Sequence, residues 1–221
     1  LSEVPARKLA DEEALVLQGY LNAMNPSKRS RVARWSGALA MAACLLLMVS
    51  MGVGWQPSRW VDDFGADYVT APGEVKTVTL ADQSQVTLDA DSAIAVDFTQ
   101  GERHIQLRRG AGFFSVTHTG QSFVVEAGSG EARVLGTQFE VRLQPAGAEV
   151  TVLSGRVGVT PSKQGQQQIL TAGQQVAYAE GVADALHAVD SESRLAWREG
   201  WLNYYKAPLA DVVKDLERYY P

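Results

Sequence analysis

Cysteine and histidine are the scarcest reactive residues in this chain. Its 221 residues include one cysteine, Cys44, and three histidines, His104, His118 and His187. A single cysteine excludes an intrachain disulfide, so any exported part must be held together by a buried core. The histidines have no second ligand at metal-binding spacing, and the sequence therefore predicts no metal site.

Cofactor and catalytic signatures are also missing. Gly110-Ala111-Gly112 would need a third glycine at the position of Ser115 to form a dinucleotide fingerprint. Gly128-Ser129-Gly130 is a turn sequence and does not match the G-x-S-x-G nucleophile elbow. We therefore expect no cofactor and no enzyme that turns over an external substrate.

A run of 24 residues without charge, Trp35 to Ser58, dominates the first quarter of the chain. As a helix it is about 36 Å long, enough to cross a hydrocarbon core of about 30 Å. Ala40 and Ala42 could form a signal-peptide cleavage site, and Cys44 a lipid attachment site, but the apolar run continues beyond all three. The pattern favours a retained transmembrane helix over 35–58.

Charge asymmetry predicts the orientation of this helix. Residues 1–34 carry +2 and include four cations just before the span, whereas residues 59–221 carry −7. The positive-inside rule places the N-terminus in the cytoplasm and the C-terminus outside, which fits a bacterial inner membrane and periplasm. An acidic tail gives no indication of nucleic-acid binding.

The cytoplasmic segment 1–34 contains one amphipathic pattern. Its apolar face is formed by Ala10, Ala14, Leu17, Leu21 and Met24, and Asn25-Pro26 ends it. A single stripe of this kind needs a partner helix, or it lies on lipid headgroups beside the membrane; the sequence leaves both open.

The part outside the membrane has β patterning after a stalk at 59–70. Val75–Leu80 and Gln85–Asp89 alternate apolar and polar residues on either side of a turn, which predicts a hairpin. Ten more short strand patterns follow up to about residue 190. We expect a solvated strand edge at Arg103, Arg108 and Arg109, where the charges would prevent pairing with the edge of another sheet.

A weak repeat recurs at a spacing of 45 residues within 71–190. Ile105, Leu107, Gly110 and Phe114 correspond to Val150, Val152, Gly155 and Val159. One structural unit used twice predicts a mainly β fold of two sheets, either a β-sandwich or a β-solenoid.

The pattern becomes helical after Asp190. A stripe of Leu209, Val212, Val213 and Leu216 follows Pro208, and we expect it to pack within a small α+β domain that begins in 191–221. The chain starts at Leu1 and stops at Pro221, so both ends read as the edges of a fragment.

Residues 72–160 resemble the FecR-type family of transmembrane sigma factor regulators. The motifs that carry the resemblance are PGEVKTVTLADQSQVTLDADSAI, HIQLRRGAGFFSV, FVVEAG, RVLGTQFEVR and VTVLSGRVGV. The end, GWLNYYKAPLADVVKDLERYY, is similar to the start of a domain found at the N-terminus of secretins and TonB-dependent transducers.

The resemblance implies a cell-surface signalling relay. An outer-membrane TonB-dependent receptor, often for a siderophore, contacts the periplasmic part, and the cytoplasmic part controls an extracytoplasmic-function sigma factor, with periplasmic proteases releasing the signal. The family's sigma-binding region is a bundle of several helices, which 34 residues cannot supply. We expect a fragment of a full regulator; a member that has lost this region is the alternative.

The resemblance also implies autoproteolysis at Gly136-Thr137, since some members of the family cut themselves within the VLGT motif. The Thr137 hydroxyl would attack the Gly136 carbonyl. The sequence identifies no base, and His118 is a candidate without geometric support.

Two other functions remain open at this point. The first is a membrane-tethered periplasmic module that binds glycan or envelope components without sigma factor control. The second is an enzyme with an unread site, which would require a deep pocket of convergent polar groups.

Overall fold

The computed structural model describes residues 15–21, 62–99, 101–204 and 207–220, and the chain divides into two units, 1–55 and 56–221. In the first unit, residues 15–21 are helical and expose Leu17 and Leu21. The span expected at 35–58 lies outside the described residues. Among the residues that are described, no helix has the length and apolar character needed to cross a membrane.

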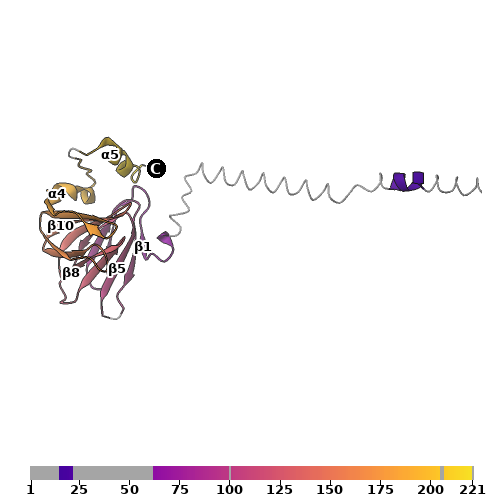
Figure 1. The fold of residues 1–221 in the computed structure, drawn as a ribbon. Coiled ribbons are helices and arrows are strands. Elements are labelled where there is room, and N and C mark those ends of the chain that lie inside the picture. The colour runs from indigo at the N-terminus through magenta and orange to yellow at the C-terminus, as the bar shows by residue number, and fades with distance from the viewer. Residues whose placement is uncertain (1–14, 22–61, 100, 205–206, 221) are drawn as a thin grey trace, which may run out of the picture. The chain divides into compact units, whose positions relative to one another are not determined.

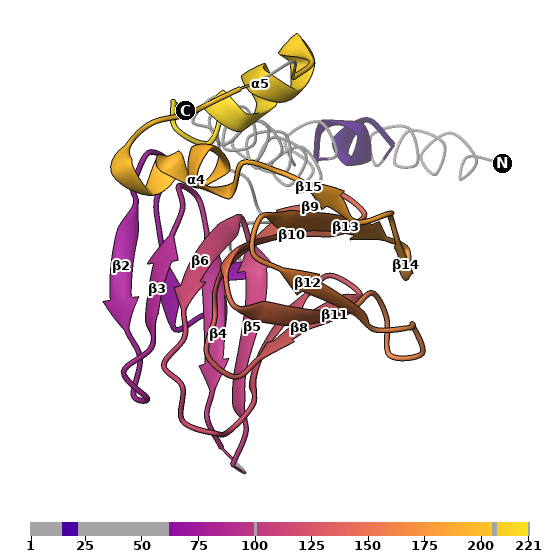
Figure 2. The ribbon, with the colours of Figure 1, turned by 90° about the vertical axis from the view of Figure 1, so that its left-hand side faces the viewer.

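The second unit is mainly β and contains two sheets (Figures 1 and 2), as the sequence predicted. The first sheet has seven strands in the order β1 (Tyr68–Val69), β4 (Ala93–Asp97), β5 (Arg103–Arg109), β7 (Phe123–Ala127), β8 (Gly130–Val134), β11 (Arg156–Thr160) and β12 (Gln168–Thr171). β1 falls within the segment expected as a stalk, so the sheet begins before Ala71.

The second sheet has eight strands. Their order is β14 (Val182–Ala183), β13 (Gln174–Ala179), β10 (Gly147–Ser154), β9 (Gln138–Gln144), β6 (Ala111–Ser115), β3 (Gln85–Leu88) and β2 (Lys76–Thr79), and β15 (His187–Ala188) also pairs with β13. β2 and β3 form the predicted hairpin, with Val78 opposite Val86.

One apolar core lies between the two sheets. Alternate residues of each strand point into it, which is the reason for the period of two in the sequence. Phe114 stacks on Phe139 with ring centroids 5.3 Å apart, and Phe123 meets Phe114 edge-on at 6.1 Å. All three rings are fully buried, together with Ile94 and Ile105.

The strands of each sheet follow one another in sequence order. The first sheet runs β1, β4, β5, β7, β8, β11, β12, and the second, read from its other edge, runs β2, β3, β6, β9, β10, β13, β14. The chain therefore passes back and forth between the sheets while advancing in one direction. This combines the layers of a sandwich with the progression of a solenoid.

Two passages between the sheets are single-residue corners at glycine. Gly110 joins β5 to β6 and Gly155 joins β10 to β11, with φ of 74° and 87°. Only glycine adopts such angles without strain. A Cβ at Gly110 would also lie 2.1 Å from the Ser92 hydroxyl oxygen, so no side chain fits there.

The 45-residue repeat corresponds to these corners. β5, Gly110 and β6 align with β10, Gly155 and β11, and β7 aligns with β12. The pairing differs between the two copies, because β7 is parallel to β5 whereas β12 is antiparallel to β11. The repeat thus describes a strand–corner–strand unit rather than a repeated sheet.

The C-terminal segment lies on the outer face of the eight-stranded sheet (Figure 2). It comprises α4 (Ser191–Arg194), the 3-10 helix η1 (Ala196–Glu199) and α5 (Leu209–Leu216). Leu195 and Trp197 are buried against Phe113 of β6 in a second apolar cluster. In the stripe on α5, Leu209 is 76 % and Val213 50 % exposed, whereas Val212 and Leu216 are partly buried.

Candidate functional site

Gly136 and Thr137 occupy the connection from β8 to β9, where the chain leaves one sheet for the other. Gly136 is exposed, whereas Thr137 is buried with 5 % of its surface exposed. The backbone N–H of Val116 donates to the Thr137 carbonyl at 3.1 Å. The bond between the two residues therefore lies at the point where an exposed bend enters the buried sheet.

Gly136 is packed too closely for any other residue. A Cβ at this position would lie 2.8 Å from Cβ and 3.1 Å from Nδ1 of His118. Gly136 is absent from the glycines with positive φ, so the requirement is one of space and not of backbone conformation. The structure thus brings His118 against Gly136, a proximity for which the sequence offered no evidence.

The Thr137 hydroxyl lies against the second glycine corner. Its Oγ1 donates to the carbonyl oxygen of Arg156 at 3.0 Å. A Cβ on Gly155 would lie 2.9 Å from this Oγ1 and 3.3 Å from the Gly136 carbonyl oxygen. A hydroxyl and the preceding carbonyl are therefore confined beside the same corner, which limits the orientations that each can take.

Arg103 connects the loops around this site, and its predicted place on a solvated edge is wrong. β5 lies between β4 and β7 inside the sheet, and Arg103 is only 3 % exposed. Its guanidinium donates to Asp82 (2.7 Å) and to the carbonyls of Thr117 (2.9 Å), Gln121 (2.5 Å) and Leu135 (3.4 Å). One buried cation thereby ties the β2–β3 turn to the loop that carries His118 and to the residue before Gly136.

Arg108 and Arg109 are likewise not edge residues. Arg109 pairs with Asp63 at 2.8 Å and with Asp91 at 3.0 Å, and Arg108 donates to the carbonyl of Phe64 at 2.6 Å. Both fasten the segment before β1 to the interior strand β5. The sequence shows that these arginines lie close together on one strand, but it does not show which distant carbonyls and carboxylates they contact in the folded protein.

Ser84 completes the Asp82 carboxylate site. Its hydroxyl donates to Asp82 at 2.7 Å and its N–H at 3.0 Å, while Ser84 Oγ accepts from the Thr117 N–H at 3.0 Å. Burial raises the pKa of Asp82, but the hydrogen bonds from Ser84 and Arg103 outweigh it, and the pKa lies below its ordinary value.

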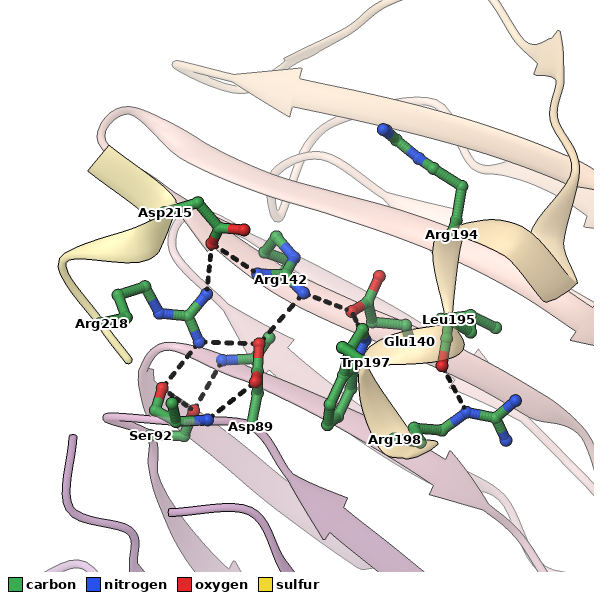
Figure 3. A network of polar contacts seen from close by, with 12 residues as sticks. Asp89, Ser92, Glu140, Arg142, Arg194, Leu195, Trp197, Arg198, Asp215 and Arg218 are labelled. Atoms are coloured by element: carbon green, nitrogen blue, oxygen red, sulfur yellow. Dashed lines mark hydrogen bonds and ion pairs between the residues drawn. The ribbon is translucent and has the colours of Figure 1, made fainter. Parts of the chain in front are cut away.

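A second polar network, which the sequence analysis missed, fastens the C-terminal segment (Figure 3). Asp89 is fully buried and accepts from Arg142 (3.1 Å), Arg218 (2.9 Å) and the Tyr219 hydroxyl. Burial and the neighbouring Asp89 raise the pKa of Tyr219 above its ordinary value. The tyrosine therefore stays protonated and acts as a donor.

Arg142 extends this network toward the second apolar cluster. It pairs with Glu140 at 2.9 Å and lies 3.5 Å from Asp215, and Glu140 accepts from Trp197 Nε1 at 2.8 Å. Burial lowers the pKa of Arg142, but its three acidic neighbours more than compensate and raise it. Among these contacts, only the i,i+3 pair of Asp215 with Arg218, at 3.1 Å, has a spacing that a helical sequence pattern reveals.

The two-sheet unit is similar to known proteins in sequence and in fold. Residues 66–158 match the model of the FecR family, described as FecR protein. The resemblance to the FecR-type family that the motifs indicated is thereby confirmed over these residues. No curated protein matches the chain.

Two crystal structures of a candidate anti-sigma factor from Parabacteroides distasonis ATCC 8503 are similar to the chain. Both are 28 % identical to it over 69 % of its length, and the match covers 74 % and 73 % of theirs, with TM-scores of 0.63 and 0.62.

Replacing Arg103 by Met should destabilise the folded unit by about 3–5 kcal/mol, because it removes the cation paired with the buried Asp82 and a donor to three carbonyls. Arg133→Met is the matched control, since Arg133 also lies in the first sheet but is 38 % exposed and pairs with Glu131 at the surface. We expect it to cost less than about 1 kcal/mol. Urea unfolding followed by tryptophan fluorescence measures both, and equal losses would contradict the organising role of Arg103.

The Asp82 site also predicts the acid dependence of stability. Because the folded pKa is depressed, the contribution of Asp82 is present above the ordinary value of 3.8 and is lost as the pH falls from there through the lower folded pKa. Urea midpoints of the wild type should therefore fall more steeply below about pH 4 than those of Asp82→Asn. Parallel curves for the two proteins would show that Asp82 has no such linkage.

Proposed function

We propose that this protein is an anti-sigma regulator that relays a signal from an outer-membrane TonB-dependent receptor to an extracytoplasmic-function sigma factor. The observation that carries the proposal is the match of 66–158 to the FecR family, together with the similarity to a candidate anti-sigma factor. A sigma factor is the partner that this class of protein requires. The relay itself is inferred from the family resemblance.

The relay needs a particular location. The uncharged run 35–58 and the cations before it support a single-pass inner-membrane protein with its N-terminus in the cytoplasm and its C-terminus in the periplasm. In that arrangement the two-sheet unit meets the receptor. Its edge strand β2 and the exposed face of α5 are the places where a partner could add a strand or a helix.

The Gly136-Thr137 bond is the proposed site of self-cleavage. Thr137 Oγ1 attacks the Gly136 carbonyl carbon, the C–N bond breaks, and the hydroxyl proton passes to the amine of Thr137, which leaves an ester. Water then hydrolyses the ester to a Gly136 carboxylate and restores the hydroxyl. The confinement of Oγ1 and the Gly136 carbonyl beside Gly155 supports this step, and His118 is the titratable group packed against Gly136.

Thr137→Ala should abolish self-cleavage, because it removes the attacking oxygen, whereas Thr137→Ser should retain it. Thr151→Ala is a control, since Thr151 is another buried threonine, which accepts from Gln175 at 2.8 Å. Denaturing gels and mass spectrometry should show a fragment beginning at Thr137 in wild type, Thr137→Ser and Thr151→Ala. An intact wild-type chain would overturn self-cleavage, though not sigma factor control.

A tethered binding module is the second candidate function, and one observation favours it. A groove of about 320 Å³ lies on the outer face of the eight-stranded sheet beside η1. Most of its lining side chains carry hydroxyl, amide or charged groups, which can bind the hydroxyl groups of a glycan: Thr77, Gln85, Thr87, Phe113, Ser115, Gln138, Arg198 and Glu199.

Transcript profiling of the parent organism separates the two candidates. After deletion of the gene, with and without the inducing ligand, we expect a small regulon to change, headed by a gene for an outer-membrane receptor. The direction of the change distinguishes an inhibitor from an activator. An unchanged transcriptome in both conditions would reject sigma factor control and favour the tethered module.

A further inference from the structure

The Gly136-Thr137 bond divides both sheets between two contiguous halves. Because the strands follow sequence order, residues 66–136, the N-half, contain β1, β4, β5, β7 and β8 of the first sheet and β2, β3 and β6 of the second. Residues 137–220, the C-half, contain all later strands. No strand of one half lies between strands of the other, so the halves could separate without threading one chain through the other.

Two short ladders and a part of the core form the seam between these halves. β8 pairs with β11 through three residue pairs, and β6 pairs with β9 through five. Phe114 of the N-half stacks on Phe139 of the C-half at this seam. β8 and β9 lie in different sheets, so cutting the chain between them breaks no ladder.

The network around Asp89 crosses the same seam. Asp89 belongs to the N-half, whereas its three side-chain partners Arg142, Arg218 and Tyr219 all belong to the C-half. Arg218 also donates to the Ala90 carbonyl at 2.7 Å. Arg142 of β9 and Arg218 of the C-terminal segment therefore neutralise a carboxylate that is buried in the other half.

An apolar contact accompanies this polar one. Phe113 of the N-half is covered by Leu195 and Trp197 of the C-half, and the Arg198 guanidinium lies 4.0 Å from the centre of its ring. The C-terminal segment thus passes back over the seam and contacts the N-half at Asp89, at Phe113 and at Gly73, whose N–H donates to the Arg218 carbonyl at 2.9 Å. Figure 3 shows Arg142 in contact with Asp89 and with Glu140, and Glu140 in turn accepts from Trp197.

We infer that Asp89 and its surroundings form the binding surface through which the N-half holds the C-half, with the C-terminal segment 191–220 as a clasp. The partner that fits this surface is the C-half of the same chain. When the 136–137 bond is cut, the clasp acts with the two ladders and the shared core to keep the two pieces in one body, and release of Arg218 and Tyr219 from Asp89 is the first step in their separation. The inference holds however the bond is cut, so it does not depend on self-cleavage.

The test uses the full chain in detergent, with a recognition sequence for a specific protease inserted after Gly136 and with Thr137→Ala to remove the native nucleophile. After cutting, the halves should co-elute on size exclusion. Asp89→Asn and Arg218→Met should each raise the dissociation rate of the cut halves, measured by exchange with labelled C-half, by about tenfold or more.

Two control variants remove a comparable ion pair inside one half. Asp63 and Arg109 are 2.8 Å apart and both lie on the N-terminal side of the 136–137 bond, outside the clasp, so Asp63→Asn and Arg109→Met should leave the dissociation rate unchanged. Circular dichroism of the uncut variants checks their folding; if Asp89→Asn fails to fold, Arg218→Met decides, since its side chain is 19 % exposed. Equal rates in all variants, or immediate separation of the wild-type halves on cutting, would overturn the inference.

Discussion

The glycine corners at Gly110 and Gly155 are the constraint on which the rest of this architecture depends. Each sends the chain from one sheet to the other within a single residue, at a φ that a side chain would strain. Because the chain changes sheet within one residue, it has no long connection that could carry the next strand to a distant position. The next strand therefore joins its sheet beside the strand that was added last. Repeated along the chain, this produces two sheets whose strands both follow sequence order.

In-order pairing gives the two buried carboxylates different roles. Asp82 and its partner Arg103 lie in the same half, where the pair draws three loops together beside Gly136. Asp89 pairs with two cations of the other half, Arg142 on β9 and Arg218 in the C-terminal segment. Burying the charges of both pairs costs desolvation free energy, which a surface ion pair largely avoids. A buried ion pair is therefore weak evidence for a gain in stability. Their contribution here is to specify which segments meet.

The sequence was informative wherever a pattern is local. The hairpin at 75–89, the many short strands, the 45-residue unit and the two-sheet architecture all follow from alternation and turn residues. Arg103 was misplaced because alternation identifies the face of a strand but not whether its neighbours cover it. The Asp89 network joins positions up to 130 residues apart, and His118 meets Gly136 only through the folding of two loops. No local pattern encodes such contacts.

The position of the 136–137 bond follows from the same topology. A break inside a strand, or between two strands of one hairpin, would leave an unpaired or frayed ladder, whereas β8 and β9 belong to different sheets and share no ladder. The bond contributes to assembly mainly by keeping the halves at a high effective concentration. Once it is cut, that contribution disappears and the seam, the core contacts and the clasp must hold the halves alone. Cleavage at the proposed site would therefore leave a sandwich whose two halves are held by non-covalent contacts only.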